Sequence, residues 1–162
     1  MYTRNTMKRI IAQWPLPPRT KEARQAAWIV AAMLTIMTVG QLFSFDKFIP
    51  LLDAFHLPGE GTGQLTAVTL VTCGVLALPF LLQMKLSIAM RWASMFAGWL
   101  VMAIWLFLSV WMNVSDVDID NAGLVGASVT LIPGWWVFCA VLGLTVLTIW
   151  ASWGLWPSQR KK

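Results

Sequence analysis

The stretch AAWIVAAMLTIMTVGQLFSF, Ala26 to Phe45, contains no Asp, Glu, Lys or Arg. It is roughly 20 residues long, enough for a helix to cross a hydrocarbon core of about 30 Å. Three further stretches have the same character, namely 65–84, 92–112 and 135–156. A backbone in lipid must satisfy its own hydrogen bonds, so each span is expected to be a helix. The sequence therefore predicts an all-α, polytopic membrane four-helix bundle that forms one domain, residues 26–156.

The charged residues indicate how the spans are oriented. Only 12% of the chain is charged, against about 25% in a soluble domain. Eleven of the twelve basic residues fall on one side of the predicted membrane: Arg4, Lys8, Arg9, Arg19, Lys21, Arg24, Lys85, Arg91, Arg160, Lys161 and Lys162. Because cytoplasmic segments carry the excess of Lys and Arg, we expect a basic arm (1–25) and a basic tail (157–162) in the cytoplasm of a multi-pass cell-membrane protein. The net charge of +5 is then a sign of topology and not of nucleic-acid binding.

A short amphipathic segment follows the first span, in FSFDKFIPLLDAFHLPGEG (Phe43 to Gly61). Phe48, Leu51, Leu52 and Phe55 recur at helical spacing, which places four apolar side chains on one face. A helix this short cannot cross a membrane. It is expected to lie in the outer interface with its apolar face toward the lipid, or to dock on top of the bundle.

The caps of this short helix can also be assigned from the sequence. Asp46 is positioned to cap its start, which would place Pro50 in the first turn, where proline is tolerated.

The candidate residues for a ligand or partner surface lie in the first outer segment and in the first and third spans. These candidates are Gln41, Asp46, Lys47, Asp53, His56, Glu60, Trp99 and Trp105. Gln41 is the one amide in its span and is expected to hydrogen-bond across helices. No Ser/His/Asp set, phosphate-binding glycine loop or intramembrane charge is present, so no catalytic residue and no cofactor is predicted.

Three hypotheses for function remain open. The first is a non-catalytic accessory protein that binds a membrane protein partner or a second copy through the outer segments or through the small-residue faces of its helices. The second is a carrier of a small hydrophobic ligand, such as a quinone or lipid, in a pocket lined by Trp99, Trp105, Met95 and Met102, with Gln41 or Asp46 at its mouth. The third, the least favoured, is an enzyme using His56 with Asp46, Asp53 or Glu60, or a membrane oxidoreductase subunit.

The second outer segment contains alternating carboxylates, Asp116, Asp118 and Asp120. This spacing is similar to the start of an EF-hand calcium loop, which needs glycine at its sixth position and glutamate at its twelfth. Here those positions are Asn121 and Ala127. A solvated acidic loop is therefore favoured over a metal site.

Taken together, these features resemble the DoxX/MauE-like group of small four-helix membrane proteins. The similarity covers residues 25–112. It lies in the segments LFSFDKF and IPLLDAFHLPG, the glycine-containing turn after them, and the tight hairpin between the second and third spans. Lys47 matches the family's lysine after the first helix, whereas Gln64 and Thr66 stand where an acidic residue is usual. The resemblance implies a bacterial inner-membrane protein that assists redox enzymes or envelope stress responses, and it implies no reaction.

Overall fold

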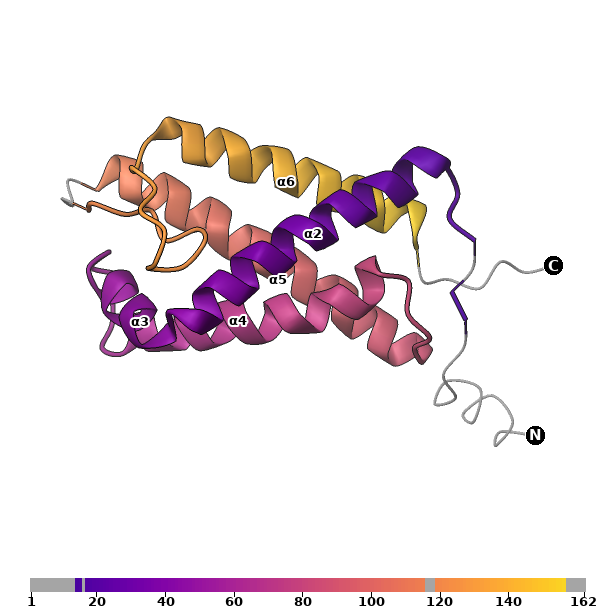
Figure 1. Cartoon of the computed structure of the whole chain (residues 1–162), viewed down its shortest axis with the longest axis horizontal. Helices are drawn as coiled ribbons and strands as arrows, with labels where there is room; N and C mark the ends of the chain where they lie inside the picture. Colours follow the sequence, from indigo (N-terminus) through magenta and orange to yellow (C-terminus); the bar gives the residue numbers. More distant parts are fainter. Residues whose placement is uncertain (1–13, 16, 116–118, 157–162) are drawn as a thin grey trace.

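The structure is a computed structural model that describes residues 14–15, 17–115 and 119–156. These residues form five helices and no strand (Figure 1). The helices are α2 (Lys21–Phe43), α3 (Phe45–Asp53), α4 (Thr62–Leu81), α5 (Ile88–Val114) and α6 (Trp135–Gly154). The prediction of an all-α chain is thus confirmed. All helices except α3 are long and apolar enough to cross a membrane.

The long helices do not coincide with the charge-free stretches. α2 begins at Lys21, before the predicted span 26–45, because the Thr20 hydroxyl accepts a hydrogen bond from the Ala23 N–H (3.1 Å) and caps the helix. α5 likewise begins four residues before 92, where Ser87 caps it. A good cap lets a helix extend beyond its apolar part into polar surroundings. The limits of the membrane spans inside these helices stay predictions.

The long helices are arranged in a ring of neighbours. α2 packs against α4 and α6, and α5 packs against the same two helices on the other side. α3 lies beside α4 at one end of the molecule, and α2 begins and α6 ends at the opposite end (Figure 1). The core between the long helices includes Leu34, Leu70, Trp105 and Val137, all nearly or fully buried.

Small residues lie where the helices approach most closely. A side chain on Gly74 of α4 would overlap Thr38 of α2, and one on Gly154 of α6 would overlap Ala23. Small residues at such points let helix backbones come together without a hydrophobic driving force. Gly143 of α6, in contrast, faces open space.

The outward faces of the long helices are strongly apolar. Ile36, Phe96 and Ile149 are 56%, 53% and 55% exposed, respectively. A soluble monomer rarely exposes apolar surface over all its helices. The fold is therefore compatible with an integral membrane protein whose outward side chains contact lipid.

Candidate functional site at the capped end

One end of the molecule is closed by a substructure that we call the cap: α3, the turn 54–61 and the loop 119–134. α3 follows α2 after a break at Ser44, which is its N-cap residue. Asp46 lies in the first turn and Pro50 lies beyond it. The predictions that Asp46 caps this helix and that Pro50 falls in its first turn were therefore wrong. The helix begins earlier than expected because it continues almost directly from α2.

The apolar face of α3 is buried in the protein. Phe48 and Leu52 of α3, and Phe55 in the turn just after it, are all 0% exposed, and Leu51 is partly buried beside Gly123 of the loop. The predicted apolar face is confirmed at these positions. Since α4 and the loop already cover that face, it is not available to lipid. Of the two placements expected from the sequence, the contacts of α3 therefore fit the one in which it docks on the other helices.

The loop of the cap is folded around the side chain of Asn121. The Asn121 carboxamide oxygen accepts hydrogen bonds from the backbone N–H groups of Gly123 and Leu131, both at 3.0 Å. The Ala122 N–H also donates to the Leu131 carbonyl at 2.8 Å. Asn121 is only 6% exposed. One buried side chain therefore closes the loop between residues 121 and 131.

Two hydrogen bonds fasten this loop to the end of α2. The Gln41 amide donates to the Leu124 carbonyl at 3.1 Å, and the Ala127 N–H donates to the Ser44 hydroxyl at 2.8 Å. Gln41 is 2% exposed, and a buried amide without such a partner would be costly. The expected bond of Gln41 to another helix is not found, since its partner is a loop carbonyl.

A third contact joins the cap to α5. The Trp111 indole N–H donates to the Phe55 carbonyl at 2.8 Å. From the sequence, Trp111 has no assigned role in the cap, and Ser44 and Asn121 were not candidates either. The glycine two positions after Asn121, at Gly123, is the one local signal that could have indicated a turn centred on an asparagine side chain.

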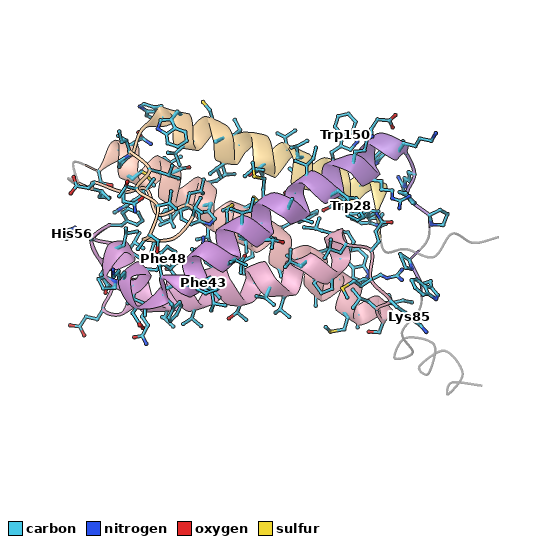
Figure 2. The ribbon with its side chains drawn as sticks, in the orientation of Figure 1. Trp28, Phe43, Phe48, His56, Lys85 and Trp150 are labelled. Carbon is cyan, nitrogen blue, oxygen red and sulfur yellow. The ribbon has the colours of Figure 1, made fainter. Side chains whose placement is uncertain are left out.

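The charged candidates of the first outer segment all lie on the surface of the cap. They are Asp46, Lys47, Asp53, His56 and Glu60, and each is exposed. Figure 2 shows His56 at the extreme end of the molecule, far from Trp28 and Lys85. The His56 Nδ1 atom lies 2.8 Å from the Ala54 carbonyl oxygen, a local contact within the turn. We call these five exposed side chains of the capped end the polar face of the cap.

No metal-binding group of three or more His, Cys, Asp and Glu side chains occurs in the described part of the chain. Asp116 and Asp118 lie outside the described residues, and Asp120 is exposed. The two cysteines are separated, with a partly buried Cys73 in α4 and an exposed Cys139 in α6.

The tryptophan candidates occupy two different environments in α5. The Trp99 indole N–H donates to the Ser152 hydroxyl of α6 at 2.9 Å. Trp105 is 0% exposed, and its indole N–H finds no partner among the described residues. The structure does not bring the predicted pocket residues together, because Met95 and Trp105 belong to the core and Gln41 lies beneath the loop.

A groove nevertheless exists between α5 and α6. Its volume is about 310 Å³ and its surface is almost wholly apolar. It is lined by Trp99, Met102, Ala103, Leu106, Thr145, Thr148 and Ile149. Trp99 and Met102 are the predicted pocket residues that it contains.

No family model matches this chain, and neither a curated protein nor a solved structure matches it. The DoxX/MauE-like resemblance of residues 25–112 therefore stays a prediction.

Proposed function

We propose that this chain is an integral membrane accessory protein of the DoxX-like type, in which the cap docks a partner protein. α2, α4, α5 and α6 span the bilayer as a four-helix bundle, and α3 lies at the membrane interface. One observation carries the proposal: Phe48, Leu52 and Phe55 are fully buried, while every charged residue of the same segment is exposed. α3 thus uses its apolar face for folding and presents its polar face for binding.

The charge distribution supports the cap as the outer end. The described basic residues other than Lys47 lie at the opposite end, from Arg19 to Arg24 and from Lys85 to Arg91. Trp28 and Trp150 lie toward that same end (Figure 2), at the level where aromatic side chains meet lipid headgroups. This arrangement supports cytoplasmic termini in a bacterial inner membrane.

The polar face of the cap also indicates the chemistry of its partner. Asp46, Asp53 and Glu60 are acidic, and Lys47 is the single basic residue among them. A partner with a basic surface would be guided to this face, since complementary charge speeds association and suppresses wrong partners. Buried hydrogen bonds hold the face in place, so little ordering is required on binding.

Crosslinking in the native membrane tests this function. A photo-reactive residue at His56 should form a covalent adduct with one partner, whereas the same residue at Met90, exposed in α5 at the other end, should not. The double change Asp46→Lys and Glu60→Lys should reduce the adduct at least about tenfold, because like charges would then oppose each other. Glu22→Lys, the matched reversal at the opposite end, should leave it unchanged.

Two results would remove the accessory function. One is a bare monomer in every extract with no adduct from position 56. The other is an adduct whose yield does not respond to the reversed charges.

The groove between α5 and α6 favours a second candidate function, the carriage of a small hydrophobic ligand. Its volume of about 310 Å³ lies at the lower end of the range for small-molecule sites, about 300–1,000 Å³. Its apolar wall suits a quinone ring or an acyl chain. The pair formed by Trp99 and Ser152 fixes one side of it by a hydrogen bond between α5 and α6.

Filling the groove tests the second candidate. Ala103→Trp places a bulky ring among the lining residues, and we expect about a tenfold loss of decylubiquinone binding because the space is taken. Ala140→Trp, at an exposed position of α6 outside the groove, is the control and should bind normally. Native mass spectrometry of the detergent-solubilised protein measures both. Equal binding by the two variants would show that the groove is not the ligand site.

A further inference from the structure

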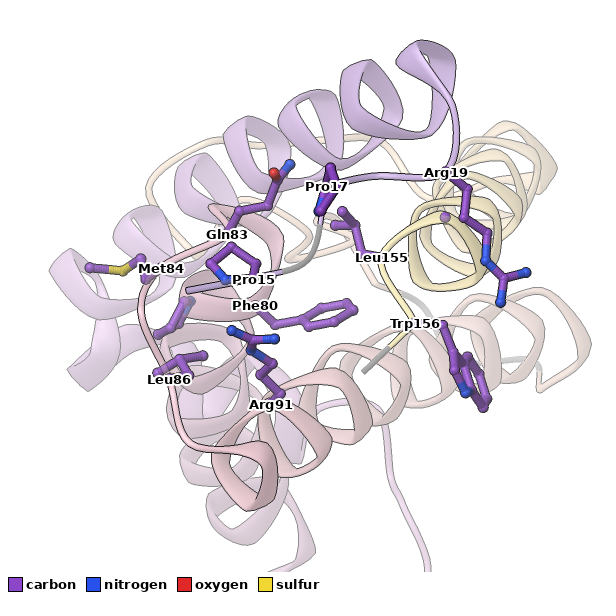
Figure 3. A pocket seen from close by; sticks show the side chains of 12 residues that line it. Pro15, Pro17, Arg19, Phe80, Gln83, Met84, Leu86, Arg91, Leu155 and Trp156 are labelled. Carbon is purple, nitrogen blue, oxygen red and sulfur yellow. The ribbon is translucent and has the colours of Figure 1, made fainter. Parts of the chain in front are cut away.

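A second concave site lies at the basic end, opposite the cap. It is formed where the segment before α2 crosses the ends of α4, α5 and α6 (Figure 3). The residues that line it are Pro15, Pro17, Arg19, Pro79, Phe80, Gln83, Met84, Leu86, Arg91, Gly154, Leu155 and Trp156. Its volume of about 40 Å³ exceeds the roughly 10–15 Å³ needed for one water molecule. There is room for a small polar group such as a phosphate.

The segment before α2 is fastened in place by Arg19. The Arg19 N–H donates to the Gly154 carbonyl at 3.0 Å. The Arg19 guanidinium lies 5.2 Å from the centre of the Trp153 ring, which is within the range of a cation–π contact. The wall of the cavity is therefore ordered by contacts with the end of α6.

A buried cation forms the floor of the cavity. Arg91 is 8% exposed, although it is only the fourth residue of α5. Its guanidinium points in among the lining residues, beside Phe80 and Pro15 (Figure 3). A planar guanidinium with five donors is well suited to phosphate oxygens.

Gln83 lies in the turn between α4 and α5, in a conformation that favours glycine. Its φ is +56°. The Met84 N–H donates to the Pro79 carbonyl (2.9 Å) and the Gln83 N–H to the Phe80 carbonyl (3.1 Å). This is the Schellman pattern, in which glycine usually occupies the left-handed position. A glutamine there carries a conformational penalty, which glycine would avoid.

The Gln83 side chain lines the cavity with an unused donor. Its amide nitrogen is buried and has no hydrogen-bond partner among the described residues. A buried donor without an acceptor is unfavourable. An oxygen-rich ligand in the cavity would supply the acceptor, and this would also explain why glutamine stands where glycine would be less strained.

We propose that this cavity binds the anionic headgroup of a phospholipid, with the phosphate near Arg91 and a further oxygen accepting from the Gln83 amide. The surroundings favour a lipid as the source of the phosphate. Met84 and Trp153, each 52% exposed, and Trp156, 36% exposed, bring apolar and aromatic surface to the same end. Basic cavities between membrane helices on the cytoplasmic side are typical headgroup sites.

Lipid titration tests this site in the full chain, purified in a neutral detergent. Phosphatidylglycerol should form a one-to-one adduct in native mass spectrometry and raise the unfolding midpoint. Phosphatidylcholine with the same acyl chains, and inorganic phosphate alone, should do neither. This proposal rests on the chain being an integral membrane protein but not on the partner of the cap, so the lipid site and the docking function can each fail alone.

Two variants, which should affect folding differently, test the roles of Arg91 and Gln83 in lipid binding. Arg91→Gln should weaken phosphatidylglycerol binding at least about tenfold, the loss expected for a hydrogen bond to a charged group. Gln83→Gly should also weaken binding, while its unfolding midpoint without lipid stays equal or rises because the left-handed strain is removed. Lys85→Gln, which removes an exposed charge beside the cavity without lining it, is the control and should bind normally.

Each contrary outcome overturns the proposal. These outcomes are normal binding by Gln83→Gly, a loss in Lys85→Gln as large as that in Arg91→Gln, equal binding of the two lipids, or equal stabilisation by inorganic phosphate.

Discussion

Replacing Phe48 by alanine should lower the free energy of unfolding by about 3–5 kcal/mol, the usual cost of removing a buried phenyl ring. Phe48 is 0% exposed and belongs to the core that α3 forms with the rest of the protein. The ring fills space that α3 and its neighbours cannot close by small movements, because protein interiors are tightly packed. Of the changes considered for the cap, this one should be the most damaging.

Phe43→Ala is the matched control for this prediction. Phe43 lies five positions earlier, at the end of α2, and is 87% exposed (Figure 2). The same atoms are removed, but no cavity forms, so the loss should be below about 1 kcal/mol. Thermal unfolding in detergent measures both variants, and hydrogen exchange across 45–61 reports whether α3 has detached. A similar loss in the two variants would contradict the packing of α3 described above.

The long helices could be predicted from the sequence because each depends on local information. A charge-free run of roughly 20 residues needs no partner in the chain to be identified as a helix in lipid. The ends of the helices were less predictable. Thr20 and Ser87 act through a hydrogen bond to one N–H group each, a contact that hydropathy does not register, and α2 and α5 therefore extend into charged sequence.

The cap could be predicted only in part. The apolar stripe of α3 follows from spacing alone, and it indicated Phe48, Leu52 and Phe55 correctly as one face. The contacts that hold the cap join residues more than 50 positions apart, such as Trp111 with Phe55 and Gln41 with Leu124. No periodicity in a single sequence specifies such pairs, because they arise from the way the long helices bring distant loops to one end.

The site at the basic end could not be predicted from the sequence either, although both of its polar residues are visible there. Arg91 was assigned to topology, as a positive charge flanking a span, and Gln83 attracted no interpretation. The structure places both residues in the lining of one cavity, where Arg91 and the amide nitrogen of Gln83 are buried. A residue whose charge predicts topology can therefore also line a cavity, and only the packing of the chain reveals that second feature.

Gly126→Ala should be the most damaging single change in the loop of the cap. Gly126 has a φ of +84°, and a left-handed backbone costs about 1–2 kcal/mol for a residue with a side chain. The added methyl group would also overlap the Gly40 carbonyl of α2 and the hydroxyl of Ser44, which follows α2. Because backbone atoms cannot rotate away, this overlap should add about 1–3 kcal/mol.

Gly61→Ala isolates the contribution of the contact from that of the backbone. Gly61 has a similar φ of +73°, but no atom lies near the position that its side chain would take. The free energy of unfolding of this variant should fall only by the cost of the left-handed backbone, about 1–2 kcal/mol.

The difference between the two variants, measured by thermal unfolding, then reports the contact between the loop and α2. In Gly126→Ala the Ala127 N–H should also exchange faster, since its bond to Ser44 depends on the same close approach. Equal losses in the two variants, with no change in the exchange of the Ala127 N–H, would mean that the close approach of Gly126 to the end of α2 does not support the loop. The polar face of the cap would then lack the rigid support on which its proposed docking role depends.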